Sequence, residues 1–197
     1  NVYLIQTVTD SAKISFQRGL AGTEGSRLNY IGLGTIDLDN GNVTAAEANF
    51  ALALKDAKKK DIEELTAIGR AYTYSNKPNY KKAIEYLNKA KLINPNDALV
   101  QLALGDAFYG DKNQNEAYAA YRNAYAADAS LIRAKMQLGV LLKGAKAYTE
   151  AIKAYDEVVK LNPSYGPVYR ELAETYYYWA NNQPKTYTEN IAKALQN

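Results

Sequence analysis

The sequence contains no cysteine and no histidine among its 197 residues. These absences exclude disulfide bonds, a cysteine nucleophile, an imidazole base and the usual zinc sites. No run of 18 apolar residues is present, so we expect no membrane-spanning helix, and the first residues do not resemble a signal peptide. The fold must therefore be held by the burial of apolar side chains, and no cofactor or metal is expected.

The net charge of the chain is also small. The 24 Lys and Arg residues exceed the 21 Asp and Glu residues by three, while 47% hydrophobic and 23% charged residues are typical of a folded protein. The densest basic run, Lys58-Lys59-Lys60, is interpreted as a solvated turn between helices. A nucleic-acid binder usually concentrates Lys and Arg on one face, and a surplus of three charges is small, so we expect no nucleic-acid partner.

A helical signature recurs along the chain with a period close to 34 residues. Alanines separated by 34, 37, 34 and 34 residues lie at positions 12, 46, 83, 117 and 151. Each is followed four residues later by a large side chain, at positions 16, 50, 87, 121 and 155, and three residues further by a small one or, once, by Val158. This spacing places the three side chains on one face of a helix, which we call helix B.

A second signature alternates with the first along the chain. It consists of the pairs Leu33-Gly34, Ile68-Gly69, Leu104-Gly105, Leu138-Gly139 and Leu172-Ala173. A glycine inside a helix costs about 1 kcal/mol relative to alanine, so its recurrence indicates a close approach between helices. The sequence therefore predicts an A helix in each unit, with Phe50 packed beside Gly34 and Tyr121 beside Gly105.

Turn-forming residues separate the two kinds of helix. Clusters of Gly, Asn, Ser and Pro lie between A and B at 40–42, 75–79, 110–113 and 143–144, and between B and the next A at 94–97 and 162–164. Such residues end helices and favour turns. Each repeat is therefore predicted to be an antiparallel helix pair.

This pattern resembles the tetratricopeptide repeat. The resemblance implies an all-α, right-handed superhelical solenoid of antiparallel helix pairs, forming one array over residues 1–197. Full repeats are expected at 27–60, 61–97, 98–131 and 132–165. Residues 10–26 are expected to form the B helix of a partial repeat, with its A helix at most hinted at by 2–8, and residues 166–197 a divergent repeat with an A helix at 166–180 and a last helix at 187–195. Neither end resembles a polar capping helix and the chain starts with Asn, so we expect a processed chain or a segment of a longer protein.

The resemblance further implies that the A helices line a concave surface for a peptide or a partner protein. Tyr and Arg are favoured at binding hot spots, and Tyr176 to Trp179 cannot all point inward from one helix. The expected groove residues are Thr66, Arg70, Thr73, Tyr74, Asp106, Tyr109, Arg133, Met136, Lys143, Arg170, Glu174, Tyr177 and Tyr178. Relatives that bind chaperone tails use a Lys and an Asn on the first A helix; Ile31 and Thr35 stand at those positions here, so that partner is not expected.

Other functions are weighed on the same residues. Adjacent carboxylates such as Glu63-Glu64 point about 100° apart on a helix and do not form an acid–base pair. Residues 37–41 resemble a calcium loop, but the glycine comes one place early and Ala48 replaces the bidentate Glu. The Gly32-Leu33-Gly34 segment is expected inside a helix and is no phosphate loop.

The sequence thus predicts a non-catalytic protein-interaction scaffold whose partner is a protein or peptide. The alternative is an assembly module that associates with itself through open solenoid ends. We expect a bacterial periplasmic or envelope protein, with the cytoplasm as the alternative.

Overall fold

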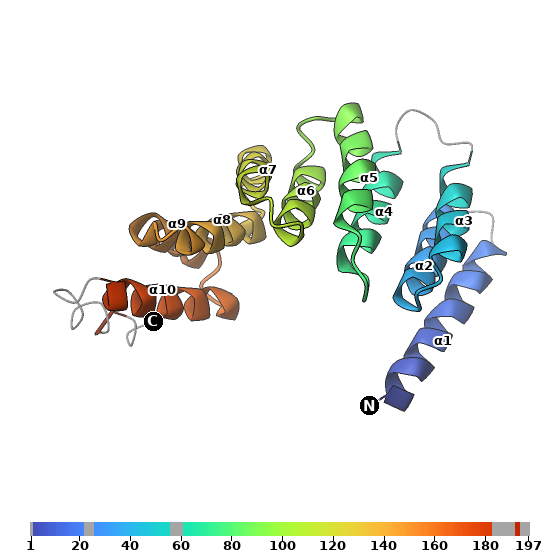
Figure 1. The fold of residues 1–197 in the computed structure, drawn as a ribbon, viewed down its shortest axis with the longest axis horizontal. Coiled ribbons are helices and arrows are strands. Elements are labelled where there is room, and N and C mark those ends of the chain that lie inside the picture. The colour runs from blue at the N-terminus through green and yellow to red at the C-terminus, as the bar shows by residue number, and fades with distance from the viewer. Residues whose placement is uncertain (1, 22–25, 56–60, 183–191, 194–197) are drawn as a thin grey trace. The chain divides into compact units, whose positions relative to one another are not determined.

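A computed structural model describes residues 2–21, 26–55, 61–182 and 192–193 (Figure 1). Within these residues the chain forms ten α-helices and no β-strand, as the sequence predicts. The helices are α1 (Val2–Leu20), α2 (Ser26–Asp39), α3 (Val43–Leu54), α4 (Ile62–Tyr74), α5 (Tyr80–Ile93), α6 (Ala98–Gly110), α7 (Gln114–Ala127), α8 (Ile132–Gly144), α9 (Tyr148–Leu161) and α10 (Gly166–Asn182). Their contacts group into two compact units, residues 1–113 and residues 114–197.

Each unit is built from A and B helices that alternate along the chain. In unit 1 the A helices are α2, α4 and α6, and the B helices are α1, α3 and α5; in unit 2 the A helices are α8 and α10, and the B helices are α7 and α9. Figure 1 shows α2 beside α3, α4 beside α5, and α8 beside α9. The pairs α2–α3, α4–α5 and α8–α9 each lie within one unit.

The pairs are held at the glycines of the A helices. A Cβ atom added at Gly34 or Gly69 would lie 2.5 Å from the Phe50 ring or from Leu87, closer than real Cβ atoms approach. The ring of Tyr155 fills the space beside Gly139 in the same way. The predicted contact between Gly34 and Phe50 is thus confirmed.

The second predicted contact joins two units. Gly105 is buried in α6, whereas Tyr121 is buried in α7. Because these helices belong to unit 1 and unit 2, the packing of Tyr121 beside Gly105 stays a prediction.

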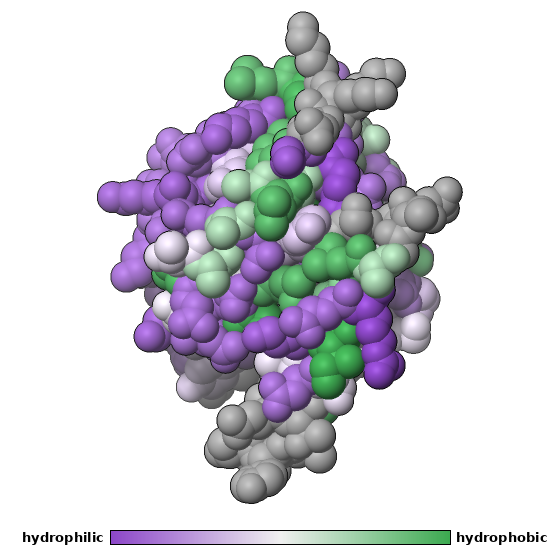
Figure 2. Space-filling model, turned by 90° about the vertical axis from the view of Figure 1, so that its right-hand side faces the viewer, coloured by the Kyte–Doolittle hydropathy of each residue, from purple (hydrophilic) through white to green (hydrophobic). Residues whose placement is uncertain are grey.

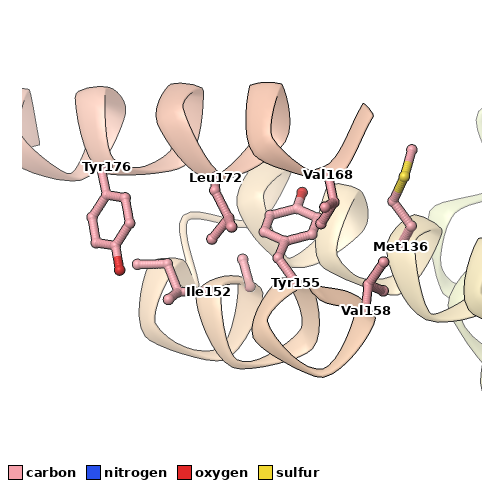
Figure 3. Packing of buried hydrophobic residues seen from close by; sticks show 8 residues of the cluster. Met136, Ile152, Tyr155, Val158, Val168, Leu172 and Tyr176 are labelled. Atoms are coloured by element: carbon pink, nitrogen blue, oxygen red, sulfur yellow. The ribbon is translucent and has the colours of Figure 1, made fainter. Parts of the chain in front are cut away.

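Unit 2 has a core that extends from the α8–α9 pair onto α10. Figure 3 shows Val168, Leu172 and Tyr176 of α10 facing Ile152 and Tyr155 of α9. The spacing of the three α10 residues, at i, i+4 and i+8, places them on one stripe of that helix. The face of an A helix that points away from this core is left for other contacts.

Turns end the helices where the sequence places breakers. Gly41, Lys112 and Lys146 adopt positive φ angles of 80°, 63° and 61° in the A-to-B turns. Such a conformation is unusual for a residue with a side chain. Before α6, the Asp97 carboxylate accepts hydrogen bonds from the N–H groups of Leu99 and Val100, both at 3.0 Å, and so caps the helix.

Both ends of the described chain differ from the prediction. Helix α1 is continuous over Val2–Leu20, so residues 2–8 extend the helix expected to begin at residue 10 instead of hinting at a separate one. No Gly or Pro interrupts the segment before Gly19, which explains the continuity. Helix α10 continues two residues past the predicted Ala180, to Asn182. The predicted last helix at 187–195 lies outside the described residues, except for residues 192 and 193, which are helical.

Apolar side chains reach the surface on the first helices of unit 1. Val8 and Ile14 of α1 and Leu52 of α3 are exposed. Figure 2 faces the end of the unit that bears these helices, and hydrophobic surface is visible there between polar side chains. These residues lie outside the face on which the sequence predicts a site.

Candidate functional site

The A helices of unit 1 enclose a groove on the side that does not pack against the B helices. It has a volume of about 550 Å³. Its lining comes from α2, α4 and the start of α6, and consists of Leu28, Ile62, Glu63, Thr66, Ala67, Arg70, Asp97 and Leu99. We call this the A groove; all of it lies within unit 1.

Apolar side chains are exposed in the A groove. Leu28 on α2 is 43% exposed and Leu99 on α6 is 59% exposed. The helix face explains their position, since Leu33 and Leu104 occupy the buried side of α2 and α6. Exposed leucines that line a concavity can bury apolar area against a partner.

Two side chains of opposite charge line the same groove. Arg70 and Glu63 both lie on α4 and both are exposed. No ion pair or hydrogen bond joins either side chain to another described residue. By contrast, Asp97 is engaged as the cap of α6.

Further along the A helices of unit 1, two predicted residues contact each other. The Tyr74 hydroxyl at the end of α4 donates a 2.5 Å hydrogen bond to the Asp106 carboxylate of α6. Tyr74 remains 52% exposed, and Tyr109 on the next turn of α6 is also exposed. The predicted residues Arg70, Tyr74, Asp106 and Tyr109 therefore belong to one unit and to neighbouring A helices.

The A helices of unit 2 bear a network of charges that engage one another. The Lys143 ammonium of α8 lies 2.7 Å from a carboxylate oxygen of Glu171 and 2.7 Å from one of Glu174, both on α10. The side chains of Lys143 and Glu171 are only 14% and 10% exposed. Burial lowers the pKa of Lys143, but the hydrogen bonds and charges of the two glutamates outweigh it and raise that pKa overall. Lys143 thus joins α8 to α10.

The other predicted residues of unit 2 are more accessible. Arg170 is largely exposed, and its guanidinium lies 3.5 Å from Glu171. Tyr177 and Tyr178 are exposed on α10, whereas Tyr176 is buried in the core. This confirms that the aromatic run does not point to one side. Arg133, at the start of α8, is half-buried.

Three residues of the predicted groove are buried instead. The hydroxyls of Thr66 and Thr73 donate to the carbonyls of Ile62 and Gly69 one turn earlier, and Met136 packs in the core of unit 2. A threonine that bonds its own helix backbone presents no free hydroxyl. Thr73 and Met136 therefore lie in the packing between helices, while Thr66 lines the A groove as a buried wall.

The sequence pattern misses several residues that line the A groove. Leu28 and Leu99 stand in the first turns of their helices, outside the repeat signature, and the sequence indicates no role for Glu63 beyond that of a solvated carboxylate. The spacing of Glu63, Ala67 and Arg70, at i, i+4 and i+7, is the signal that could have shown that the three share one helix face.

A second cleft of unit 1 lies at its A-to-B turns. It measures about 540 Å³ and is lined by Leu38, Gly41, Val43, Tyr72, Lys77, Pro78, Asn79, Tyr80, Lys81 and Asp111. It contains none of the predicted groove residues. In the part of the chain that the structure describes, no cluster of three or more acidic side chains could hold a metal ion, and no helix is long and apolar enough to cross a membrane.

The positions rejected for other functions have structural roles. Ile31, at the first clamp position, is buried, and the Thr35 hydroxyl donates to the Ile31 carbonyl. Asp37 accepts a hydrogen bond from the Asn49 side chain. Gly32 lies inside α2, where the ring of Phe16 from α1 contacts it.

Comparisons with known proteins agree with the helix pairs. The tetratricopeptide repeat model matches residues 68–97 and 132–165. No curated protein shows significant similarity to the sequence.

Solved structures show the same fold at low sequence identity. MamA is 21% identical, with a TM-score of 0.67 over 86% of this chain and 90% of its own. YrrB, described as a tetratricopeptide repeat protein with an unusual peptide-binding site, is 18% identical. Its match has a TM-score of 0.62 and covers 92% of this chain and 91% of YrrB. PilF of Pseudomonas aeruginosa is 24% identical. Its match has a TM-score of 0.64 and covers 85% of this chain and 76% of PilF.

The repeat signatures, the helix pairs and these matches lead to one assignment. The fold is the α-solenoid of such repeats, which serves in general as a protein-interaction module and is generally non-catalytic. Residues 68–97 and 132–165 match the tetratricopeptide repeat model, and the chain has the fold of tetratricopeptide repeat proteins.

Proposed function

We propose that this protein is a non-catalytic scaffold that binds a peptide segment of a partner protein on its A helices, with the A groove of unit 1 as a main contact. The observation on which this depends is the groove itself: three A helices enclose about 550 Å³ between exposed leucines. That volume lies within the range of about 300–1,000 Å³ typical of ligand sites.

The chemistry of the lining supports binding over catalysis. Leu28 and Leu99 offer apolar area that a partner would remove from water, at roughly 25 cal/mol per Å² buried. Two carboxylates near the groove are engaged in structure, Asp97 as a helix cap and Asp106 as the acceptor for Tyr74. Such groups position helices; they are not arranged around a common reacting centre.

The likeness to YrrB supports a peptide as the partner class, because that protein is described as having an unusual peptide-binding site. A peptide can lie along successive A helices and contact Tyr74 and Tyr109 beyond the groove, both of which are exposed. Tyrosines supply contact area with little loss of side-chain freedom.

Selection from a displayed random-peptide library tests the proposal. The whole chain would be compared with Ala67→Arg, which places a long charged side chain in the groove. Leu92→Arg is the matched control, because Leu92 is 83% exposed on the B helix α5. We expect peptides selected on the wild type to bind Leu92→Arg equally and Ala67→Arg at least tenfold more weakly.

Circular dichroism would establish that both variants keep their helix content. Peptides that bind the wild type and Ala67→Arg with equal affinity would place the interaction elsewhere on the protein and refute the A groove as its site.

A further inference from the structure

Two of the three charged side chains that line the A groove, Glu63 and Arg70, differ from the third, the helix cap Asp97, and from other charges on the A helices. Arg27 is held by Asp61 and Glu64, at 2.9 Å and 3.3 Å, and Lys143 is held by Glu171 and Glu174. Arg70 and Glu63, in contrast, face the groove without an ion pair to any described residue. Their charges are therefore available to a partner.

The positions of these charges give the groove a polarity. Arg70 follows Glu63 by seven residues, or two turns of α4, so the two side chains share one face. At a rise of about 1.5 Å per residue, their backbone positions lie about 10 Å apart along the helix. Ala67 stands between them, and Leu28 and Leu99 line the groove from α2 and α6. An apolar floor thus has a cation at one end and an anion at the other.

From this arrangement we propose that the A groove selects an extended segment in which an acidic and a basic side chain flank an apolar one. The inference rests on the proposed function and names the chemistry of its partner. The acidic side chain pairs with Arg70, the apolar side chain lies over Ala67 between the leucines, and the basic side chain pairs with Glu63.

The geometry of an extended segment suits these three contacts. Alternate residues of such a segment point to the same side, and residues four apart are separated by about 13 Å. Side chains at positions i, i+2 and i+4 would therefore meet Arg70, the apolar floor and Glu63 in order, with the flexible Arg and Glu side chains spanning the small difference. The partner pattern is acidic–any–apolar–any–basic, read in either chain direction.

Each charge pair should be worth a modest factor in affinity. Ion pairs between exposed side chains change a binding constant about two- to fivefold. The preference should weaken at high salt, because exposed charges are screened.

Three labelled peptides on one serine frame test the inference by fluorescence anisotropy. Each has a leucine at its central position. The residues two positions before and two positions after this leucine are Glu and Lys in the first peptide, two Glu in the second and two Lys in the third. We expect the whole wild-type chain to bind the mixed peptide about two- to fivefold more tightly than either of the others. Glu63→Lys should shift the preference to the peptide with two Glu, and Arg70→Glu to the peptide with two Lys.

The controls make the same charge changes outside the groove. Glu150→Lys on α9 and Arg122→Glu on α7 alter exposed side chains of unit 2 and should keep the wild-type order of the three peptides. An order that is unchanged in Glu63→Lys and Arg70→Glu, or no binding of the three peptides to the wild type, overturns the inference. If library-selected peptides in that case still bind Ala67→Arg more weakly than the wild type, the proposed function stands. If they bind both proteins equally, the proposed function and this inference both fail.

Discussion

Gly139 illustrates how one missing side chain determines a helix contact. The Tyr155 ring of α9 occupies the space where a Cβ atom of residue 139 would lie. Alanine has the higher helix propensity, by about 1 kcal/mol, but at this position its methyl group would displace a fully buried ring. Overpacking of this kind typically costs about 1–3 kcal/mol.

We therefore expect Gly139→Ala to lower the free energy of unfolding by up to about 2 kcal/mol in urea titrations. Gly144 provides a control in the same helix, because nothing lies within 4 Å of a Cβ atom added there. Gly144→Ala should leave stability unchanged or raise it. Equal effects of the two substitutions would refute the role of the Tyr155 contact.

Tyr155 also makes the stability of the protein depend on pH in the alkaline range. Its hydroxyl is buried without a hydrogen-bond partner among the described residues, and burial raises its pKa above the ordinary value. The unfolded chain releases this proton near pH 10, whereas the folded chain retains it. The contribution of the protonated Tyr155 side chain to the free energy of unfolding is thus fully present below about pH 10, and it is lost as the pH rises toward the pKa of the folded state.

Tyr155→Phe should change stability little at pH 7, since an unpartnered hydroxyl adds no hydrogen bond. Between pH 10 and pH 11 the variant should lose about 1 kcal/mol less unfolding free energy than the wild type. Urea titrations at pH 7, 10 and 11 measure the difference. Parallel losses in the two proteins would show that Tyr155 ionises equally in both states.

At the scale of elements, Lys143 links α8 to α10. Replacing one partner of a buried ion pair leaves the other charge uncompensated, at a cost of about 3 kcal/mol, while apolar replacement of both is often nearly neutral. Lys143→Met should therefore destabilise the protein by about that amount.

Adding Glu171→Leu to Lys143→Met should restore at least half of the loss. Thermal unfolding of the wild type, both single variants and the double variant forms a double-mutant cycle. Strictly additive losses would mean that the two side chains do not interact in solution.

The elements also show how much of the fold and of the site follows from the sequence. The pairing of Gly34 with Phe50 follows from two phases of one repeat, because a helical glycine needs a neighbouring large side chain to compensate its cost. The partners of Lys143 could not be predicted, since Glu171 lies 28 residues away and only the stacking of α10 on α8 brings it close. Leu28 and Leu99 could not be predicted as groove residues for another reason. They stand outside the repeat signature, and a degenerate repeat pattern describes buried packing positions better than exposed surface positions.

At the scale of the whole molecule, contacts fall into two units, and the single tryptophan reports on one of them. Trp179 packs beside the core of unit 2, with its ring 6.3 Å from that of Tyr176. Repeat arrays are stabilised by contacts between neighbouring elements, so a local defect need not affect distant repeats equally.

We expect Leu172→Ala to cost about 2–5 kcal/mol and to shift the tryptophan fluorescence transition in urea to lower concentration than the circular dichroism transition. Ile68→Ala, which alters a fully buried residue of α4, should shift the dichroism signal and move the fluorescence midpoint less. Coincident transitions in both variants would show that the chain unfolds as one cooperative block.

The fit of a large side chain beside each glycine has an evolutionary consequence. Positions 34 and 50, 69 and 87, and 139 and 155 each share one space between two helices, so neither member of a pair can change size alone without loss of stability. Among homologues, a larger residue at the first position should coincide with a smaller one at the second. The lineage of this protein should therefore retain these pairs as jointly inherited features while the exposed lining of the A groove diversifies with its partners.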